Sequence, residues 1–133
     1  MAVTVGWVFA EKRALLVQRT EYWTWDEAQT TTRQILSLLD GAGHGVSLIY
    51  DFRAITRFPP IGFSANMRDI ITRIGSHPNL SRVLLVVTDP DVHTLLETAY
   101  RLYGGRDDHP LFVQTMDKAR QIIDDDRFAA SRG

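Results

Sequence analysis

A serine two residues after a glycine has the residue type and spacing that could support a reaction. Residues 62–66 read Gly-Phe-Ser-Ala-Asn and share a glycine and a serine with the Gly-x-Ser-x-Gly turn that presents the nucleophile of many hydrolases. The second glycine is missing, residues 53–61 separate the segment from the preceding strand, and no aspartate-then-histidine pair follows in a convincing position. We therefore predict no catalytic residue, and we expect Ser64 to face solvent in the first turn of a helix.

A glycine-rich segment at residues 41–45 contains the residue type that lets a loop approach phosphate closely. A dinucleotide-binding loop follows a strand and opens a helix, whereas this segment follows a predicted helix and precedes a predicted strand. The end of a helix also carries partial negative charge, which repels phosphate. The segment therefore predicts a helix end followed by a turn.

Histidine and aspartate side chains could hold a metal ion, but their spacing does not favour one. The histidines form no His-x-His or His-Glu-x-x-His pattern, and the chain has no cysteine. The acidic runs lack the alternating oxygen ligands and the glycine of a calcium loop. We predict no metal and no cofactor, with the histidines bonded locally and the acidic runs solvated. These residues are His44, His77, His93, His109, Asp107, Asp108, Asp124, Asp125 and Asp126.

Arginines gather in the sequence around a Pro-Pro loop at residues 59–60. Arg53 and Arg57 follow the strand predicted at residues 46–52, and ligands of open α/β sheets bind at the carboxyl ends of the strands. An anion or an acidic partner would fit two guanidinium groups there, with ordinary surface arginines as the alternative. The other members of the group are Arg68, Arg73 and Arg82.

The composition limits the classes of protein that these residues can belong to. The chain has 133 residues, of which 44% are hydrophobic and 23% charged, and this predicts one domain over residues 1–133 with a frayed tail from about residue 124. A net charge of −1 excludes a nucleic-acid footprint over the whole surface. No apolar run approaches the roughly 20 residues that span a bilayer, and no basic segment precedes the apolar start. We expect a cytoplasmic protein with no membrane span and no nucleic-acid partner.

Strand and helix patterns alternate along the chain and predict the order β-β-α-β-α-β-α-β-α. Helices between strands imply right-handed parallel crossovers, whereas the charged turn at residues 11–13 joins the first two strands into a hairpin. The uniformly apolar run at residues 83–87 indicates a strand buried on both faces. The fold class is therefore α/β, a single domain with a mixed five-stranded sheet and about four helices. The expected elements lie at residues 3–9, 14–17, 25–40, 46–52, 63–74, 83–87, 90–103, 111–113 and 115–123.

Apolar stripes predict which face each helix buries. The third helix has five apolar residues at helical spacing, all expected to point inward: Val92, Leu95, Leu96, Ala99 and Leu102. Before the first helix, Thr24 and Glu27 form a capping-box pattern. Tyr22 and Trp23 precede this cap and act either as a staple against the helix or, if exposed, as a contact surface. A homodimer through Tyr22 and Trp23 is one alternative that the sequence leaves open.

The assembled pattern resembles the STAS fold of anti-sigma-factor antagonists, and it resembles the bacterial STAS/SEC14-like (SpoIIAA-like) proteins more closely. The resemblance covers nearly the whole chain, and the motifs that carry it are structural. They are Trp23-Thr24-Trp25-Asp26-Glu27, Leu48-Ile49-Tyr50-Asp51-Phe52-Arg53, Pro59-Pro60, His77-Pro78-Asn79-Leu80, the strand at residues 83–87 and the helix at residues 115–123. The resemblance implies a SpoIIAA/STAS-like domain with a regulatory role in signalling.

The chain departs from the antagonists at their switch. In the antagonists an Asp-Ser-Ser-Gly segment follows the strand that ends in aspartate, and a partner kinase phosphorylates its serine. When Asp51 is placed on that aspartate and Gly62 on that glycine, Pro59, Pro60 and Ile61 take the Asp-Ser-Ser positions. No hydroxyl is present to carry phosphate, so no functional residue transfers from the family.

Two functions remain as expectations. The first is a non-catalytic regulatory or protein-interaction domain, and its partner is a protein. The alternative is a carrier or sensor of a small apolar, lipid-like ligand, as the SEC14 side of the resemblance implies. The alternative requires a cavity of about 300 Å³ or more, lined by residues such as Phe52, Phe58, Phe63 and Met67. An enzyme of unassigned reaction is the remaining class.

We place the candidate binding surface on the loop that joins the third strand to the second helix. The loop follows the carboxyl end of a strand, its prolines limit the entropy lost on binding, and it combines an aromatic ring with two guanidinium groups. The competing interpretation is that Pro59-Pro60 only ends one element and starts the next. The predicted site residues are Arg53, Arg57, Phe58, Pro59, Pro60 and Ser64.

Overall fold

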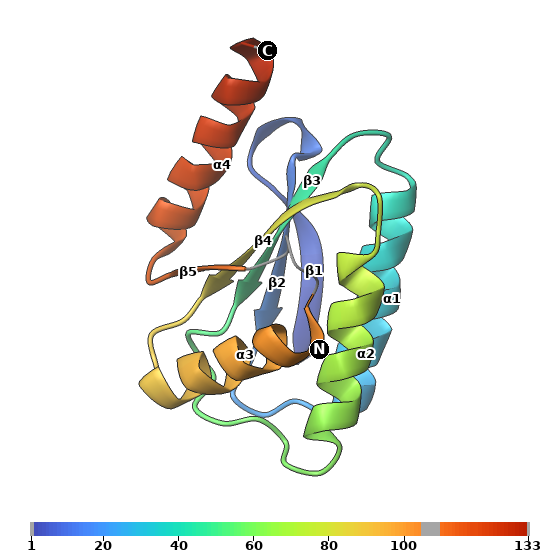
Figure 1. Cartoon of the computed structure of the whole chain (residues 1–133), viewed down its shortest axis with the longest axis vertical. Coiled ribbons are helices and arrows are strands. Elements are labelled where there is room, and N and C mark those ends of the chain that lie inside the picture. Colours follow the sequence, from blue (N-terminus) through green and yellow to red (C-terminus); the bar gives the residue numbers. More distant parts are fainter. Residues whose placement is uncertain (1, 105–109, 133) are drawn as a thin grey trace.

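The computed structural model describes the backbone of residues 2–104 and 110–132, with side chains as far as residue 126 (Figure 1). Strands and helices alternate along it in the predicted order, and a short 3-10 turn at Ala10–Lys12 joins the first two strands. The elements are β1 (Val3–Val8), β2 (Ala14–Arg19), α1 (Trp25–Asp40), β3 (Val46–Asp51), α2 (Phe63–Gly75), β4 (Leu80–Val86), α3 (Pro90–Tyr103), β5 (Leu111–Val113) and α4 (Met116–Arg132).

The strands form one mixed sheet in the order β1-β2-β3-β4-β5. β1 pairs with β2 antiparallel, and every later pair is parallel, which confirms the predicted hairpin and crossovers. β4 lies between β3 and β5, and Val83–Val87 are all buried, as the uniformly apolar run predicted. This arrangement is consistent with the predicted STAS-like topology.

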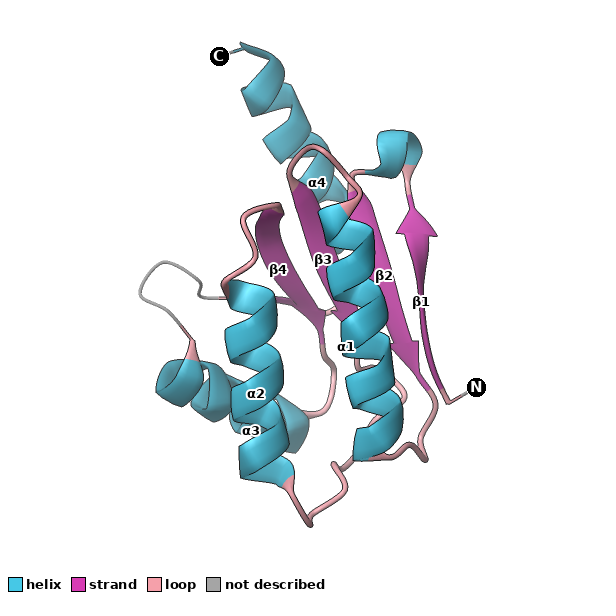
Figure 2. Cartoon of the chain, turned by 90° about the vertical axis from the view of Figure 1, so that its right-hand side faces the viewer, coloured by secondary structure: helices cyan, strands magenta, loops and turns pink. Residues whose placement is uncertain are grey.

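Helices cover the two faces of the sheet unequally. In Figure 2, α1 and α2 lie in front of the sheet and α4 lies behind its upper end. The larger hydrophobic core joins α1, α2 and α3 to one face, through residues such as Leu15, Leu48 and Leu85. A smaller core holds α4 against the other face, where Ala119 and Ile123 pack with residues of β2, β3, β4 and β5. The second face therefore depends on one helix.

No helix in the described part of the chain has the length and apolar character needed to cross a membrane.

Local caps explain where the helices begin. Thr24 Oγ1 accepts a hydrogen bond from the Glu27 amide, and the Glu27 carboxylate accepts from the Thr24 amide, so the predicted capping box is confirmed. Asp89 caps α3 by accepting from two amides. α2 begins after Gly62, whose φ of 86° lies in the left-handed region that a residue with a Cβ adopts only at a cost.

One expectation about burial on α3 is wrong. Leu95 is 42% exposed and Leu102 is 67% exposed, because the buried stripe of α3 runs along Val92, Leu96 and Ala99 and leaves both leucines on its flanks. Trp23 is 6% exposed, as the staple alternative requires, whereas Tyr22 is 73% exposed, and a homodimer stays a prediction. α4 runs from Met116 to Arg132 and is longer than the helix predicted at residues 115–123. Fraying of that end in solution stays a prediction.

The turn between β1 and β2 is strained. Phe9, Glu11 and Lys12 have φ values of 65°, 66° and 51°, although none of them is glycine. The partly buried Phe9 ring packs against the smaller core, and the Arg120 guanidinium of α4 lies over it at 5.4 Å from the ring centroid. Contacts with the core and with α4 therefore hold a backbone conformation that the local sequence does not favour.

Candidate functional site

An open cleft of about 420 Å³ lies where β2 and β3 end. Because the two strands are parallel, their last residues meet at one edge of the sheet, and Gln18 is paired with Asp51. This is the edge at which the sequence analysis expected a binding surface. The cleft is lined by Gln18, Arg19, Asp51, Arg53 and Ala54.

One ion pair forms part of this cleft. Arg53 Nε and Nη2 donate to the two carboxylate oxygens of Asp51 at 2.9 and 2.8 Å, and the Arg53 amide donates to the same carboxylate at 3.1 Å. Burial raises the pKa of Asp51, but these hydrogen bonds, the charge of Arg53 and a bond from Gln18 outweigh burial and leave that pKa below its ordinary value. The carboxylate is therefore neutralised within the cleft, and the Arg53 side chain remains 44% exposed.

Arg19 holds its guanidinium among aromatic rings. Its Cζ lies 4.8 Å from the centroid of the Trp23 ring, 5.3 Å from that of Tyr50 and 4.8 Å from that of Phe52. The side chain lies on the helix-covered face because it follows the buried Leu15 and Val17 at period two along β2. Cation–π attraction to three rings offsets part of the cost of removing this charge from water.

Several polar atoms around Arg19 are buried without a hydrogen-bond partner. They are Nε and Nη1 of Arg19, Nε1 of Trp23 and the hydroxyl of Tyr50. Arg19 lines a cavity of about 20 Å³ between the sheet, α2 and α3, and it also lines the open cleft. Arg19 thus borders both spaces. The other residues around the cavity are Trp23, Trp25, Tyr50, Phe52, Phe58, Met67, Ile70, Ile71, Leu96 and Tyr100.

Burial shifts the ionisation of this group strongly. Desolvation lowers the pKa of Arg19 to about 10, against the raising effect of Tyr50 and Tyr100. Desolvation raises the pKa of Tyr50 to about 12, with Arg19 opposing it. Burial, followed by the proximity of Tyr50, also raises the pKa of Tyr100. At neutral pH the cluster therefore carries one positive charge and two neutral phenols.

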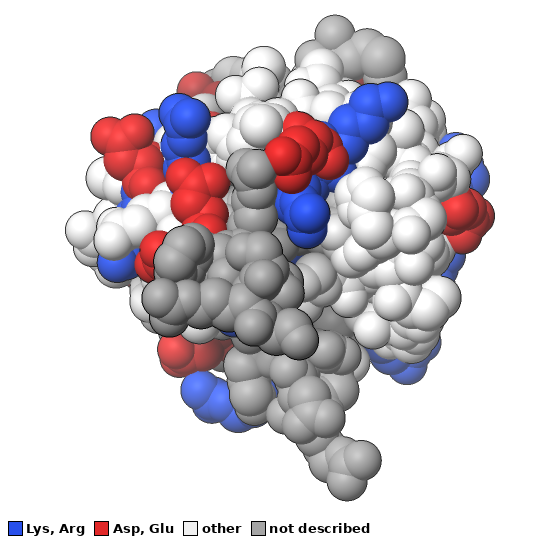
Figure 3. Space-filling model, turned by 90° about the horizontal axis from the view of Figure 1, so that it is seen from above, with Lys and Arg blue, Asp and Glu red and all other residues white. Residues whose placement is uncertain are grey.

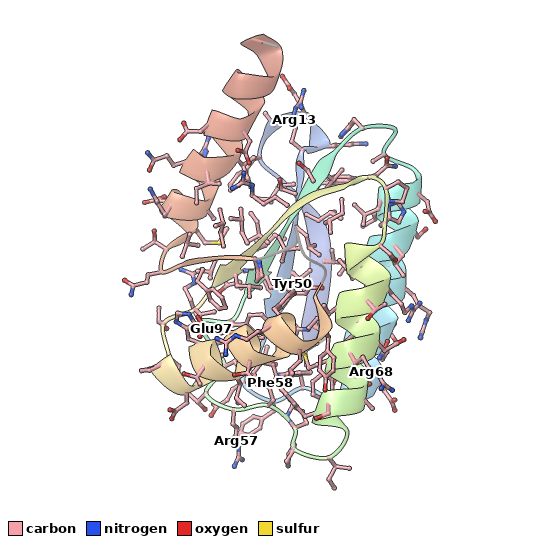
Figure 4. The ribbon with its side chains drawn as sticks, in the orientation of Figure 1. Arg13, Tyr50, Arg57, Phe58, Arg68 and Glu97 are labelled. Carbon is pink, nitrogen blue, oxygen red and sulfur yellow. The ribbon has the colours of Figure 1, made fainter. Side chains whose placement is uncertain are left out.

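The structure divides the six predicted site residues among different surroundings. Arg53 lines the cleft, whereas Phe58 is buried and lines the small cavity. Arg57 is exposed, and Figure 4 shows it pointing away from the sheet at the tip of the loop. Pro59 is half-buried, while Pro60 and Ser64 are exposed. None of these three residues lines the cleft or the cavity.

Aromatic packing fixes the Pro-Pro loop to the first helix. Trp25 Nε1 donates to the Pro59 carbonyl at 3.0 Å, and the Trp25 and Phe58 rings stack with centroids 6.3 Å apart. Phe58 also contacts Phe52 and Phe63 at 5.7 and 5.3 Å between ring centroids. The packing of Phe58 therefore fits a loop that only connects two elements, whereas Arg53 lies in the cleft, where a partner could reach it.

Sequence reasoning missed Arg19, Trp23, Tyr50 and Tyr100 as site residues. A signal for Arg19 was present, because the period-two pattern of β2 places it on the same face as the buried Leu15 and Val17. An arginine at a strand end is usually solvated, however, and nothing local shows that the β2–α1 connection, β3 and α3 bring aromatic rings to it.

The other candidate groups have local partners. His77 Nε2 lies 2.6 Å from an Asp40 carboxylate oxygen, and His77 Nδ1 accepts from the Asn79 amide at 3.0 Å, which confirms a histidine bonded locally. No group of three potential metal ligands occurs among the residues that the structure describes. His109 and the aspartates at 107–108 lie outside those residues.

Figure 3 shows acidic and basic side chains intermixed on the upper face, with no broad patch of one sign.

No family model, no curated protein and no solved structure matches the chain.

Proposed function

We propose that the chain is a non-catalytic protein-interaction domain and that a partner contacts it at the carboxyl edge of β2 and β3. The observation that carries the proposal is the open cleft of about 420 Å³ at this edge. Its lining contributes two guanidinium groups and one carboxylate, so the cleft has one excess positive charge. An acidic or carboxylate-bearing segment of a partner complements that charge.

The surroundings of the cleft support binding without chemistry. Arg53 is exposed at the rim, and the loop that follows β3 is held by the bond from Trp25 to Pro59, so little order must be created when a partner docks. Among the described residues that line the cleft, none is a serine, histidine or other nucleophile beside a base. Regulation by binding is therefore a better account of this edge than a reaction.

Site-directed crosslinking tests this proposal. A photoreactive amino acid at Ala54 places the probe in the cleft, and the same residue at the exposed Thr72 of α2 is the matched control. We expect one recurring protein to crosslink from position 54 and not from position 72, and we expect Arg53→Ala to reduce its yield. Equal crosslinking from both positions, or none from position 54, would contradict the proposal.

A carrier of a small apolar ligand is the second candidate. Three of the four residues expected to line such a cavity, Phe52, Phe58 and Met67, do line the aromatic cavity. Its volume is about 20 Å³, far below the roughly 300 Å³ that a lipid-like ligand requires, so carriage demands a large opening of α2 or α3. Native mass spectrometry of gently purified protein tests it: a retained lipid would support carriage, and its absence would count against it.

A further inference from the structure

We propose that Arg19 is the anchor of a carboxylate-binding site reached from the cleft between β2 and β3. The ligand class is an organic anion with one carboxylate group, whose head pairs with the guanidinium while its body lies in the cleft. This inference stands apart from the protein partner proposed above, because a free carboxylic acid would satisfy it equally.

The unpaired donors are the first reason. Buried polar atoms in folded proteins almost always have hydrogen-bond partners, so each exception needs an explanation. Here Arg19 Nε, Arg19 Nη1 and the Tyr50 hydroxyl are all buried and all unpaired. Arg19 lines the cleft, and its two donors can bind both oxygens of one carboxylate, whereas Tyr50 lines only the cavity.

The uncompensated charge is the second reason, and it distinguishes a carboxylate from water. The cavity of about 20 Å³ is large enough for one water molecule, which could accept from these donors. Water, however, leaves the positive charge in place. Among the ion pairs of the described residues, none includes Arg19, whose surroundings are three aromatic rings. A buried cation with no anion is costly, and an anionic ligand removes that cost.

The position of Arg19 is the third reason. The side chain lines both the closed cavity and the open cleft, so it is within reach of a molecule that enters from solvent. Asp51 does not repel an incoming anion strongly, because Arg53 neutralises it through bonds of 2.8 and 2.9 Å. Since Nε and Nη1 are covered, pairing requires the guanidinium to turn toward the cleft, and this movement changes the environment of the Trp23 ring.

Thermal unfolding and tryptophan fluorescence test the proposal with simple probes. Sodium acetate and sodium benzoate are titrated against acetamide and benzamide, which have the same shapes without the charge, at constant sodium concentration. We expect the carboxylates, and not the amides, to raise the Tm and to change the fluorescence. No difference between acid and amide up to about 100 mM, roughly a hundredfold above a 1 mM Kd, would overturn the proposal.

Three variants locate the effect. Arg19→Met keeps the length of the side chain and removes its charge, and we expect it to abolish the response. Tyr50→Phe removes a hydroxyl that lines the cavity and not the cleft, and we expect it to keep the response. Arg68→Met makes the same charge change at an exposed position of α2 that lines neither the cleft nor the cavity, and we expect it to respond as the wild type does. An undiminished response in Arg19→Met would overturn the assignment.

A further arm identifies the source of the carboxylate. N-acetyl-glutamate amide presents the side chain of an acidic residue as a protein partner would, whereas acetate represents a free acid. Binding of the blocked glutamate at least tenfold tighter than that of acetate supports a partner's acidic side chain as the occupant. Equal or tighter binding of acetate supports a free acid at the same site. Failure of both, with successful crosslinking from position 54, would overturn this inference and leave the proposed protein partner intact.

Discussion

The Arg19 side chain carries a positive charge into an aromatic layer, and the energetic cost of this placement can be measured. Because folding lowers the pKa of Arg19 to about 10, the charged form is disfavoured at every pH below 10, and the penalty is relieved as the pH rises above 10. A residue of the same length without the charge should therefore be tolerated in its place.

We expect Arg19→Met to leave the free energy of unfolding unchanged or to raise it by about 1 kcal/mol at pH 7, since a buried charge without a partner gives way to an apolar side chain. Urea unfolding measures this. Arg57→Met serves as the control, because an exposed arginine should change stability by less than about 0.5 kcal/mol. A loss of more than about 1 kcal/mol in Arg19→Met would show that the cation–π contacts outweigh the cost of burial.

Asp51 and Arg53 provide a second prediction at the scale of single residues. Burial acts to raise the pKa of Asp51, and the bonds from Arg53 reverse that effect. We expect Arg53→Met to raise the pKa of Asp51 above its wild-type value, as measured by NMR titration of the carboxylate carbon. Arg57→Met is the control and should leave the pKa of Asp51 unchanged. An unchanged pKa in Arg53→Met would show that the ion pair does not influence Asp51.

The same pair gives stability a defined dependence on pH. Since the folded-state pKa of Asp51 is depressed below 3.8, its contribution is present above pH 3.8 and is lost as the pH falls through the folded-state value. Solvent screens the pair, because the Arg53 side chain is 44% exposed, so the contribution is at most about 1 kcal/mol. In Arg53→Met the contribution of Asp51 to the free energy of unfolding should no longer fall as the pH is lowered, or should rise instead, because burial alone raises the pKa of Asp51.

At the scale of elements, the start of α2 depends on one glycine. Gly62 has a φ of 86°, and a Cβ there would lie 2.8 Å from Asn66 Nδ2. We expect Gly62→Ala to lower the free energy of unfolding by about 1–2 kcal/mol, by backbone strain and by displacement of the Asn66 side chain. Gly41→Ala is the control, because its Cβ would have no neighbour closer than 3.8 Å. Equal stabilities of the two variants would refute this account of the helix start.

The elements were predictable where their causes are local. The capping box at Thr24 and the Asp89-Pro90 start of α3 are set by residues within four positions of each other, and both are confirmed. The buried face of α3 was predicted less well. Leu95 and Leu102 fit the helical spacing, but the width of the stripe that is covered depends on how α3 packs against α2 and the sheet, and the helix sequence does not contain that information.

The candidate site was predictable only in its position. The rule that ligands bind at the carboxyl ends of parallel strands selects the edge where Arg53 lines the cleft. The cluster around Arg19 was missed because its members come from β2, the β2–α1 connection, β3 and α3, and no short sequence window holds them together. Within the sequence around position 19, Arg19 is an ordinary arginine at the end of a strand.

At the scale of the whole molecule, stability is distributed unevenly between the two faces of the sheet. The smaller core that holds α4 includes Ala119 and Ile123. Arg82 of β4 also pairs with Asp126 of α4, with 2.9 Å between Arg82 Nε and Asp126 Oδ2. We expect Ile123→Ala to lower stability by about 2–3 kcal/mol. We also expect faster hydrogen exchange in α4 than in α1, since α4 can detach without disturbing the larger core.

Hydrogen–deuterium exchange by mass spectrometry checks this prediction peptide by peptide. Gln121→Ala, a change on the exposed side of α4, is the control and should leave exchange in α4 unchanged. If Ile123→Ala accelerated exchange equally in α1 and α4, the molecule would unfold as one unit and the two faces would not be independent.

The strained turn between β1 and β2 has a consequence for how the sequence can change. Phe9, Glu11 and Lys12 each occupy a backbone region that costs about 1 kcal/mol for a residue with a Cβ. A glycine at position 11 or 12 would relieve that strain far from the cleft. A lineage that acquired it would gain mutational tolerance, because destabilising substitutions around Arg19 or Arg53 could then accumulate without unfolding the domain. The turn thereby links the evolvability of the carboxyl edge to a segment at the opposite end of the sheet.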